Sequence, residues 1–322
     1  MISRRGFVAG TLAAPFVTST LSARAEQKNL RIAYSAVSHW AGSFTAQEQG
    51  FFAERGIDAE FVLTQVSSNV PAVLLSGSVE IGCLTPPTFF QAIEGGLPLR
   101  AVCGATISSP NPSGTDSAQV VVAKGSGISG PQDFAGRKVA TPGFGSVLDI
   151  VFRAWLIKGG VDLASVSFSE TAMPNLPDVL RGGTVDAVVV ADPFLSRMVA
   201  GGMGEKMIFI SETVPPGTLM TMYATTAEYA AQNKDVIEAF QASIQQANSF
   251  IEAGGENLVQ ARQAIGQYLK LPPQALANLP IADLQALVDQ EQVTRWYDIL
   301  EQQSLVTARH PADEIVLPLG RA

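Results

Sequence analysis

The stretch VPAVLLSGSVEI at residues 70–81 predicts a short helix, a glycine stop and the start of a strand. Pro71 stands where the first turn of a helix tolerates proline, and Gly77 stands where a helix commonly ends. A second stretch, LPDVLRGGTVDA at residues 176–187, aligns with the first without a gap and repeats its order of apolar residues, proline and glycine. The chain therefore carries two copies of one helix-to-strand unit, which indicates two similar lobes.

Apolar strand segments alternate with helical segments around each copy. We expect strands at residues 30–34, 58–64, 79–83 and 99–105 in the first run, and at 119–123, 138–141, 166–169, 185–190 and 207–210 in the second. The clearest helix covers residues 147–158, where apolar residues recur at every third or fourth position. This alternation predicts an α/β fold in which each lobe is a mostly parallel sheet flanked by helices.

The last third of the chain has a helical pattern. Residues 237–251 and 258–269 have the spacing of amphipathic helices, and Pro272 ends the second of them. We expect further helix over residues 281–303. This helical region is expected to pack on the first lobe.

Two segments rich in proline, serine and glycine, near residues 108–117 and 211–218, are suited to carry the chain between the lobes. The predicted organisation is a signal peptide at residues 1–25, lobe 1 at 26–110 plus 217–322, and lobe 2 at 111–216.

Composition bounds the class of protein. The 322 residues are 47% hydrophobic and 16% charged, which is enough apolar side chain for a sizeable core. The net charge of -8 disfavours nucleic acid or an anionic membrane surface as a partner. We therefore expect a globular protein with no nucleic-acid partner.

The N-terminus predicts export. Arg4 and Arg5 belong to a segment that resembles the twin-arginine signature, an apolar stretch follows at residues 7–17, and Ala23 and Ala25 supply a small-x-small cleavage pattern. The alternative is an ordinary helix that begins with two arginines. Cleavage would remove three arginines and no acid, which takes the net charge from -8 to -11. The mature chain is expected to be periplasmic.

Cysteine and histidine usage argues against metal or redox chemistry. Cys83 and Cys103 lie in strand-like apolar runs, so we expect two buried free thiols in preference to a disulfide. The chain has no CxxC or HExxH motif, and its two histidines are far apart in sequence. No phosphate-binding glycine loop or GxSxG motif is present. We expect no metal, no cofactor and no catalytic residue.

The candidate binding residues follow the strands. In open α/β sheets, small ligands bind beyond the carboxyl ends of the strands, and with two lobes those ends can face one another across a cleft. The loops at these ends contain the candidate ligand-binding residues Ser38, His39, Trp40, Thr85, Thr88, Phe144, Gly145, Ser146 and Asp192.

Structural roles compete with binding at several of these positions. His39 and Phe144 could be packing residues, Asp192 could hold its loop, and Ser146 could cap the helix that follows it. A side chain in an open cleft contributes little to a core. We therefore expect that Trp40→Ala abolishes ligand binding without lowering the melting temperature of the unliganded protein.

The sequence leaves two possibilities for the charge of the ligand. The candidate loops contain no lysine or arginine, so an anion would rely on hydroxyls and helix N-termini. Asp192 would instead suit a zwitterion, an amine or a pyrimidine that stacks on Trp40 or Phe144. The sequence slightly favours an organic anion such as a sulfonate.

Four segments carry a family resemblance. They are AQEQGFF at residues 46–52 with GID at 56–58, LLSGSVEIG at 74–82, DFAGRKV at 133–139, and VDA at 185–187 leading to Asp192 and Pro193. In this order, over about residues 30–250, they resemble the periplasmic solute-binding proteins of ABC importers in the nitrate, sulfonate (taurine) and bicarbonate group, which are related to thiamine-pyrimidine binders.

The resemblance implies a type II periplasmic-binding-protein fold of two lobes that close on a small solute. It also implies that the closed form, as a monomer, docks on an ABC permease, and that the protein is not an enzyme. Some members of the wider superfamily are pyrimidine-forming enzymes, but their cysteine-rich motif is absent here. A third reading, a ligand-binding partner of a sensor kinase, would need the same pocket.

Overall fold

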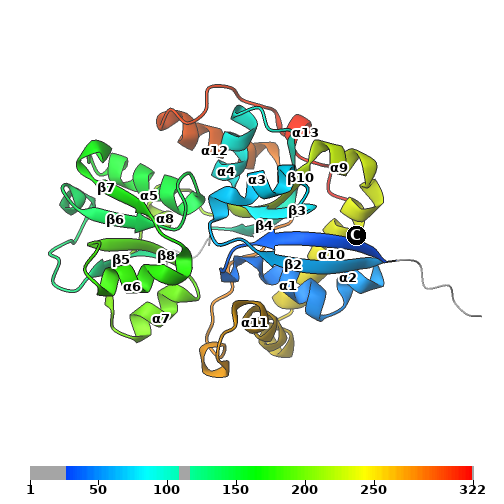
Figure 1. Ribbon diagram of the computed structural model, residues 1–322, viewed down its shortest axis with the longest axis horizontal. Coiled ribbons are helices and arrows are strands. Elements are labelled where there is room, and N and C mark those ends of the chain that lie inside the picture. The colour runs from blue at the N-terminus through cyan, green and yellow to red at the C-terminus, as the bar shows by residue number, and fades with distance from the viewer. Residues whose placement is uncertain (1–26, 109–116, 321–322) are drawn as a thin grey trace, which may run out of the picture.

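The computed structural model describes residues 27–108 and 117–320. The predicted signal peptide, residues 1–25, lies outside the described residues. Within them, two five-stranded sheets lie side by side, each with helices on both faces (Figure 1). We call the elements built on the first sheet lobe 1 and those built on the second sheet lobe 2.

Both sheets have the same topology. The first sheet has the order β2-β1-β3-β10-β4 and the second the order β7-β6-β8-β5-β9. The strands of lobe 1 are β1 (Lys28–Tyr34), β2 (Ile57–Leu63), β3 (Ile81–Leu84), β4 (Leu99–Ile107) and β10 (Leu219–Thr226). The strands of lobe 2 are β5 (Ala118–Ala123), β6 (Lys138–Thr141), β7 (Ser167–Glu170), β8 (Ala187–Ala191) and β9 (Gly204–Met207).

The matching strand orders confirm the two-lobe α/β fold and explain the internal repeat. The two repeated stretches end in β3 and β8, which occupy the same place in different sheets. The sheets are mixed but mostly parallel, as predicted, because four of the five strands in each run in the same direction. In each, the first three strands pair in parallel, whereas the strand that enters from the other lobe, β10 or β5, is antiparallel to both of its neighbours.

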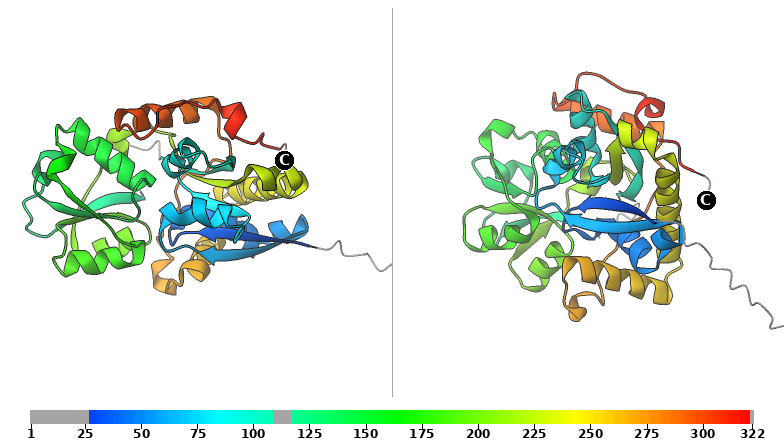
Figure 2. Two further views of the ribbon diagram at one scale, coloured as in Figure 1. Left: turned by 45° about the horizontal axis from the view of Figure 1, so that its top comes forward. Right: turned by 45° about the vertical axis from the view of Figure 1, so that its right-hand side comes forward.

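Helices cover both sheets. Those of lobe 1 are α1 (Ala41–Glu48), α2 (Phe51–Glu54), α3 (Val70–Leu75), α4 (Pro86–Glu94), α9 (Ala227–Gln232), α10 (Lys234–Glu252), α11 (Gly255–Leu269), α12 (Gln290–Gln302) and α13 (Ala312–Ile315). Those of lobe 2 are α5 (Val147–Lys158), α6 (Leu176–Arg181), α7 (Phe194–Ala200) and α8 (Ile210–Thr213). As predicted, the C-terminal helices pack on lobe 1, where α10 and α11 contact α1 and α12 contacts α4 (Figure 2).

Two predicted elements are wrong. Residues 281–289 form no helix, although Ile281, Leu284 and Val288 have helical spacing. This segment runs along β4, where the amide N of Ile107 donates to the Asp283 carbonyl O at 2.9 Å. Hydrogen bonds to a sheet edge have replaced those of the expected helix. The strand expected at residues 207–210 ends at Met207, and Ile210 begins α8.

Gly104 allows the close approach of that segment to β4. Its amide N donates to the Ala286 carbonyl O at 2.8 Å. A Cβ at this position would lie 2.3 Å from the backbone O of Gln285. Only glycine therefore lets residues 283–286 lie against the strand.

The two cysteines are buried and free, as expected. Tyr223 of β10 pairs with Cys83 on one side and with Cys103 on the other. The two thiols are thus two strand spacings apart, roughly 10 Å, which exceeds the reach of a disulfide. Burial raises the pKa of the Cys103 thiol, which keeps it protonated and unreactive.

The segments that connect the lobes meet at the end of β4. The Ser108 amide N donates to the Thr218 carbonyl O at 2.7 Å, and the Thr218 amide N donates back to the Ser108 Oγ at 3.0 Å. Both chain crossings are therefore tied together beside the space between the lobes. Among the described helices, no stretch has the length and apolar character needed to cross a bilayer.

Candidate functional site

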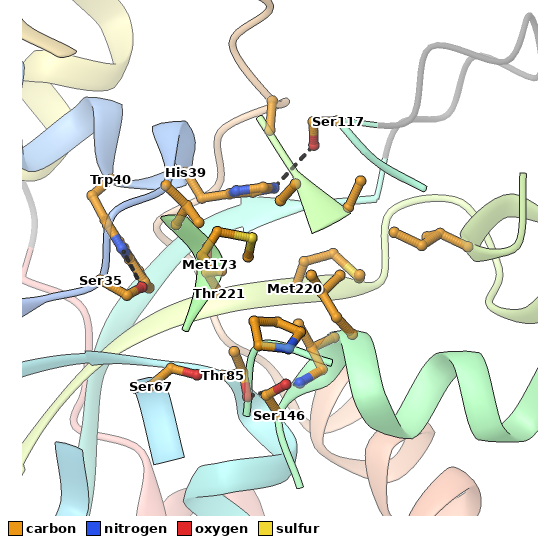
Figure 3. Close-up of a pocket in the computed structure, with 18 of the residues that line it drawn as sticks. Ser35, His39, Trp40, Ser67, Thr85, Ser117, Ser146, Met173, Met220 and Thr221 are labelled. Atoms are coloured by element: carbon orange, nitrogen blue, oxygen red, sulfur yellow. Dashed lines mark hydrogen bonds between the residues drawn. The ribbon is translucent and has the colours of Figure 1, made fainter. Parts of the chain in front are cut away.

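A cavity of about 380 Å³ lies between the lobes. Figure 3 shows side chains from both lobes that converge on it. Lobe 1 contributes Ser35, Val37, His39, Trp40, Gln65, Ser67, Leu84, Thr85, Ile107, Ser108, Met220, Thr221 and residues 280–283. Lobe 2 and the chain leading into it contribute Ser117, Ala118, Pro142, Ser146, Val147, Leu148, Met173, Ala191 and Ile210. The wall is mostly apolar, with hydroxyl groups at intervals.

Four of the nine predicted residues line this cavity: His39, Trp40, Thr85 and Ser146. His39 and Trp40 come from the 3-10 turn that follows β1, Thr85 follows β3, and Ser146 precedes α5. These positions are the loop ends from which the sequence argument selected candidates, because strand ends and helix starts converge there.

His39 is buried and neutral. Its side chain is 9% exposed, and its Nε2 lies 2.9 Å from the Ser117 Oγ, across the space between the lobes. Burial lowers the pKa of His39 to about 4, since the imidazolium form would lose its hydration. The ring therefore carries no charge at neutral pH.

Trp40 serves both the cavity wall and the core. It is 1% exposed, and its ring lies 5.8 Å from that of Tyr223, centroid to centroid. Its Nε1 donates to the Ser35 Oγ at 3.2 Å. The premise that Trp40 stands in an open cleft is wrong, because its side chain is buried.

Thr85 and Ser146 form a polar junction between the lobes. The amide N of Val147 at the start of α5 donates to the Thr85 Oγ1 at 3.2 Å, and the hydroxyls of Thr85 and Thr88 share a 2.9 Å hydrogen bond. Ser146 makes no side-chain cap to its helix, so the capping role is wrong. Its hydroxyl, in a residue 2% exposed, has no hydrogen-bond partner among the described residues and lines the cavity.

Asp192 is a loop-holding residue in this structure. Its Oδ1 accepts hydrogen bonds from the Ser196 amide N at 3.0 Å and Oγ at 2.5 Å. Burial raises the pKa of the Asp192 carboxyl above its ordinary value. Its carbonyl O accepts the Ser38 amide N at 3.1 Å, which joins the lobes. Neither Ser38 nor Asp192 is among the lining residues.

The remaining three predicted residues also lie outside the cavity wall. Phe144 is 45% exposed, and its ring lies 5.8 Å from the Arg153 guanidinium carbon. The Gly145 carbonyl O accepts the Gln91 Nε2 at 3.0 Å and the Thr88 Oγ1 at 3.4 Å. Thr88 and Gly145 thus join the lobes outside the wall, and Phe144 packs on the surface.

Several lining residues were not predicted from the sequence. Met220 and Thr221 belong to β10, the strand that returns from lobe 2, and residues 280–283 belong to the segment beside β4. Met173 lies in a 3-10 turn before α6. The return to lobe 1 could have indicated β10, since a crossing strand must pass the cleft. Residues 280–283 were not predicted to line the cavity, because the spacing of apolar residues over 281–289 indicated a helix.

The charge of the wall is low. None of its residues in the described ranges is lysine or arginine, and its only carboxylate side chain is that of the exposed Asp283. Among the described residues, no group of three or more His, Cys, Asp or Glu side chains is placed to hold a metal ion.

Comparisons with solved structures identify the fold. The alkanesulfonate-binding protein SsuA from Xanthomonas axonopodis pv. citri, bound to MOPS, has a TM-score of 0.74 at 19% identity, covering 91% of this chain and 99% of that one. The periplasmic nitrate-binding protein NrtA from Synechocystis PCC 6803 has a TM-score of 0.69 at 15% identity, covering 92% and 93%. The desulfurization enzyme DSZB has a TM-score of 0.63 at 15% identity, covering 91% and 97%.

These similarities show the periplasmic-binding-protein fold and agree with the resemblance seen in the sequence. A search of curated proteins by sequence found no match. The family model described as NMT1/THI5 like matches residues 38–254, which is more than half of the chain. The chain therefore belongs to the NMT1/THI5-like family.

Proposed function

We propose that this protein is the substrate-binding component of an ABC import system and captures a small organic solute between its lobes. The observation that carries the proposal is the 380 Å³ cavity, because its wall is built from both lobes. That volume lies within the range typical of small-molecule sites, about 300 to 1,000 Å³. A solute in it would contact both lobes at once.

Hinge closure follows from this geometry. A ligand that touches both lobes binds the closed state better than an open one, so it shifts the population toward closure. The contacts Ser38–Asp192, His39–Ser117 and Gln91–Gly145 join the lobes directly. They would form only on closure. We propose that the closed monomer then docks on the membrane permease. We also propose that lobe 1 consists of residues 26–110 and 217–322, and lobe 2 of residues 111–216.

Binding is better supported than catalysis. The only pairing of a lining hydroxyl with a lining histidine in the described residues is Ser117 with His39. A base with a pKa of about 4 is a poor proton acceptor at neutral pH. Among the described residues, no hydrogen bond orients the other ring nitrogen of His39, as a catalytic triad would require. Cys83 and Cys103, the two thiols, are not in the wall.

The sequence argument favoured a sulfonate or other organic anion, and structures of similar fold are named for alkanesulfonate and nitrate binding. The alternative of an amine or pyrimidine ligand rested on Asp192. That carboxylate is engaged by Ser196 and lies outside the wall, so it gives the alternative no support.

Closure can be tested with the mature protein and a panel of aliphatic and aromatic sulfonates, carboxylates, sulfonamides and amides. A compound present at 100 times its dissociation constant should stabilise the fold by about 2.7 kcal/mol, which raises the melting temperature by several degrees. Small-angle scattering should show a smaller radius of gyration with the same compound. Binding without compaction would contradict the hinge mechanism.

We also propose export by the twin-arginine route to the periplasm. Replacing Arg4 and Arg5 by lysine should block export, because the paired arginines are the signal that this pathway reads. The measurement is N-terminal sequencing of periplasmic and cytoplasmic fractions. A mature N-terminus at Glu26 supports the proposal, and continued export of the double variant would refute it.

A further inference from the structure

We infer that the solute accepted by this cavity is an uncharged hydrogen-bonding molecule, of the amide or sulfonamide class, and not an organic anion. The inference rests on the proposed binding function and names its substrate class. It departs from the anion that the sequence argument favoured. Its evidence is the charge of the side chains in the wall, the N-termini of α4 and α5, which are among the helix starts that border the cavity, and the hydroxyl groups of the wall.

The wall offers no positive side chain to an anion. It contains neither lysine nor arginine in the described ranges, and its only histidine is neutral at physiological pH. The exposed carboxylate of Asp283 adds negative potential. Burying an ion without a compensating charge costs far more than burying a hydrogen-bonded neutral group. Side chains alone therefore favour a neutral solute.

The N-terminus of α4 cannot compensate. Its first two residues are Pro86 and Pro87, which have no amide hydrogen. An anion at a helix start is held by the unpaired amide N–H groups of the first turn. Of the first three residues of α4, only Thr88 therefore has an amide N–H group that could point to the region beyond Thr85.

The N-terminus of α5 is already engaged. The amide N of Val147 donates to the Thr85 Oγ1. The carboxylate of Asp149, in the first turn, accepts the Gly145 amide N at 3.0 Å and the Arg153 Nε at 2.8 Å. This buried carboxylate, paired with Arg153, already occupies the first turn, where the field of the helix would otherwise favour a ligand anion.

The wall does provide hydroxyl groups, which donate and accept equally well. Ser67, Thr85 and Ser146 lie together at one end of the cavity (Figure 3). The Ser146 hydroxyl is buried and has no hydrogen-bond partner within the part of the chain that the structure describes. An amide or sulfonamide head group could satisfy that hydroxyl. Met173, Met220 and Trp40 supply an apolar wall for the rest of the molecule (Figure 3).

Matched pairs of compounds separate charge from shape. The pairs are benzenesulfonamide with benzenesulfonate, benzamide with benzoate, and hexanamide with hexanoate, each titrated calorimetrically into the mature protein at neutral pH. We expect the neutral member to bind at least about tenfold more tightly, because only the anion loses uncompensated hydration. An anion that binds as tightly as its neutral partner overturns the inference.

The two hypotheses fail in different ways. If anions bind and compact the protein in solution scattering, the substrate class is wrong while the binding function stands. If no neutral compound binds at millimolar concentration, the class is also wrong. If no compound of either kind binds or compacts the protein, the proposed function is refuted with it.

A cation placed in the cavity should reverse the preference. Met173→Lys is nearly isosteric and puts an ammonium group into the wall, so the anionic member of each pair should gain about tenfold over wild type. Met203→Lys is the matched control, since Met203 is half-buried in lobe 2 and lies outside the wall. A folded Met173→Lys variant with unchanged preference would show that the solute binds elsewhere.

Discussion

Replacing Trp40 by alanine should lower the free energy of unfolding by about 3 to 5 kcal/mol, the usual cost of removing a large buried aromatic ring. Trp40 is among the largest fully buried side chains and packs on Tyr223. The same change opens the cavity wall, so binding of any ligand found in the screen should be lost. Urea denaturation of the unliganded protein measures the first effect, and calorimetry the second.

Trp40→Phe is the control for this prediction. It retains an aromatic ring against Tyr223 and loses the hydrogen bond from Nε1 to Ser35, so its loss of stability should be clearly smaller. If alanine at position 40 costs less than about 1 kcal/mol, the ring does not belong to the core of lobe 1.

His39 should make the protein less stable in acid. Its pKa is lowered from 6.5 to about 4 in the folded protein, so below pH 6.5 the unfolded chain binds a proton that the folded chain refuses. The contribution of His39 to stability is therefore fully present above pH 6.5 and is lost as the pH falls from 6.5 toward 4. At 1.36 kcal/mol for each pH unit, the loss reaches about 3 kcal/mol.

The variant His39→Gln isolates this contribution, because burial also raises the pKa of carboxyls such as those of Asp149 and Asp192, and these groups are the same in both proteins. The free energy of unfolding should be measured at several pH values for wild type and variant. The difference between them should change by about 3 kcal/mol between pH 7 and pH 4. Parallel curves would place the imidazole in contact with solvent.

Much of the fold could be predicted from local pattern. The helix expected at residues 147–158 is α5 to the residue, and the strand expected at 138–141 is β6. Alternating strands and helices, each ended by glycine or proline, leave few topologies open. The repeat of residues 70–81 at 176–187 predicted equivalent positions in two sheets, which is where β3 and β8 lie.

The site was predicted only in part, because it depends on which loops come together. His39, Trp40, Thr85 and Ser146 stand at strand or helix ends and reach the cavity. Phe144 stands in an equally suitable loop, yet its ring faces solvent beside Arg153. Spacing along the chain says nothing about which way a loop turns.

The sequence by itself determined the α/β class, the two lobes and the family resemblance. These features follow from the spacing of apolar residues and the positions of glycine and proline within short segments. Tertiary structure decided which of the candidate loops form the wall of the cavity and what else joins them there. Residues 280–283 reached it because the edge of β4 offered hydrogen bonds that outweighed a helical pattern. His39 became neutral because the two lobes together exclude water from its ring, a consequence of contacts between residues distant in sequence.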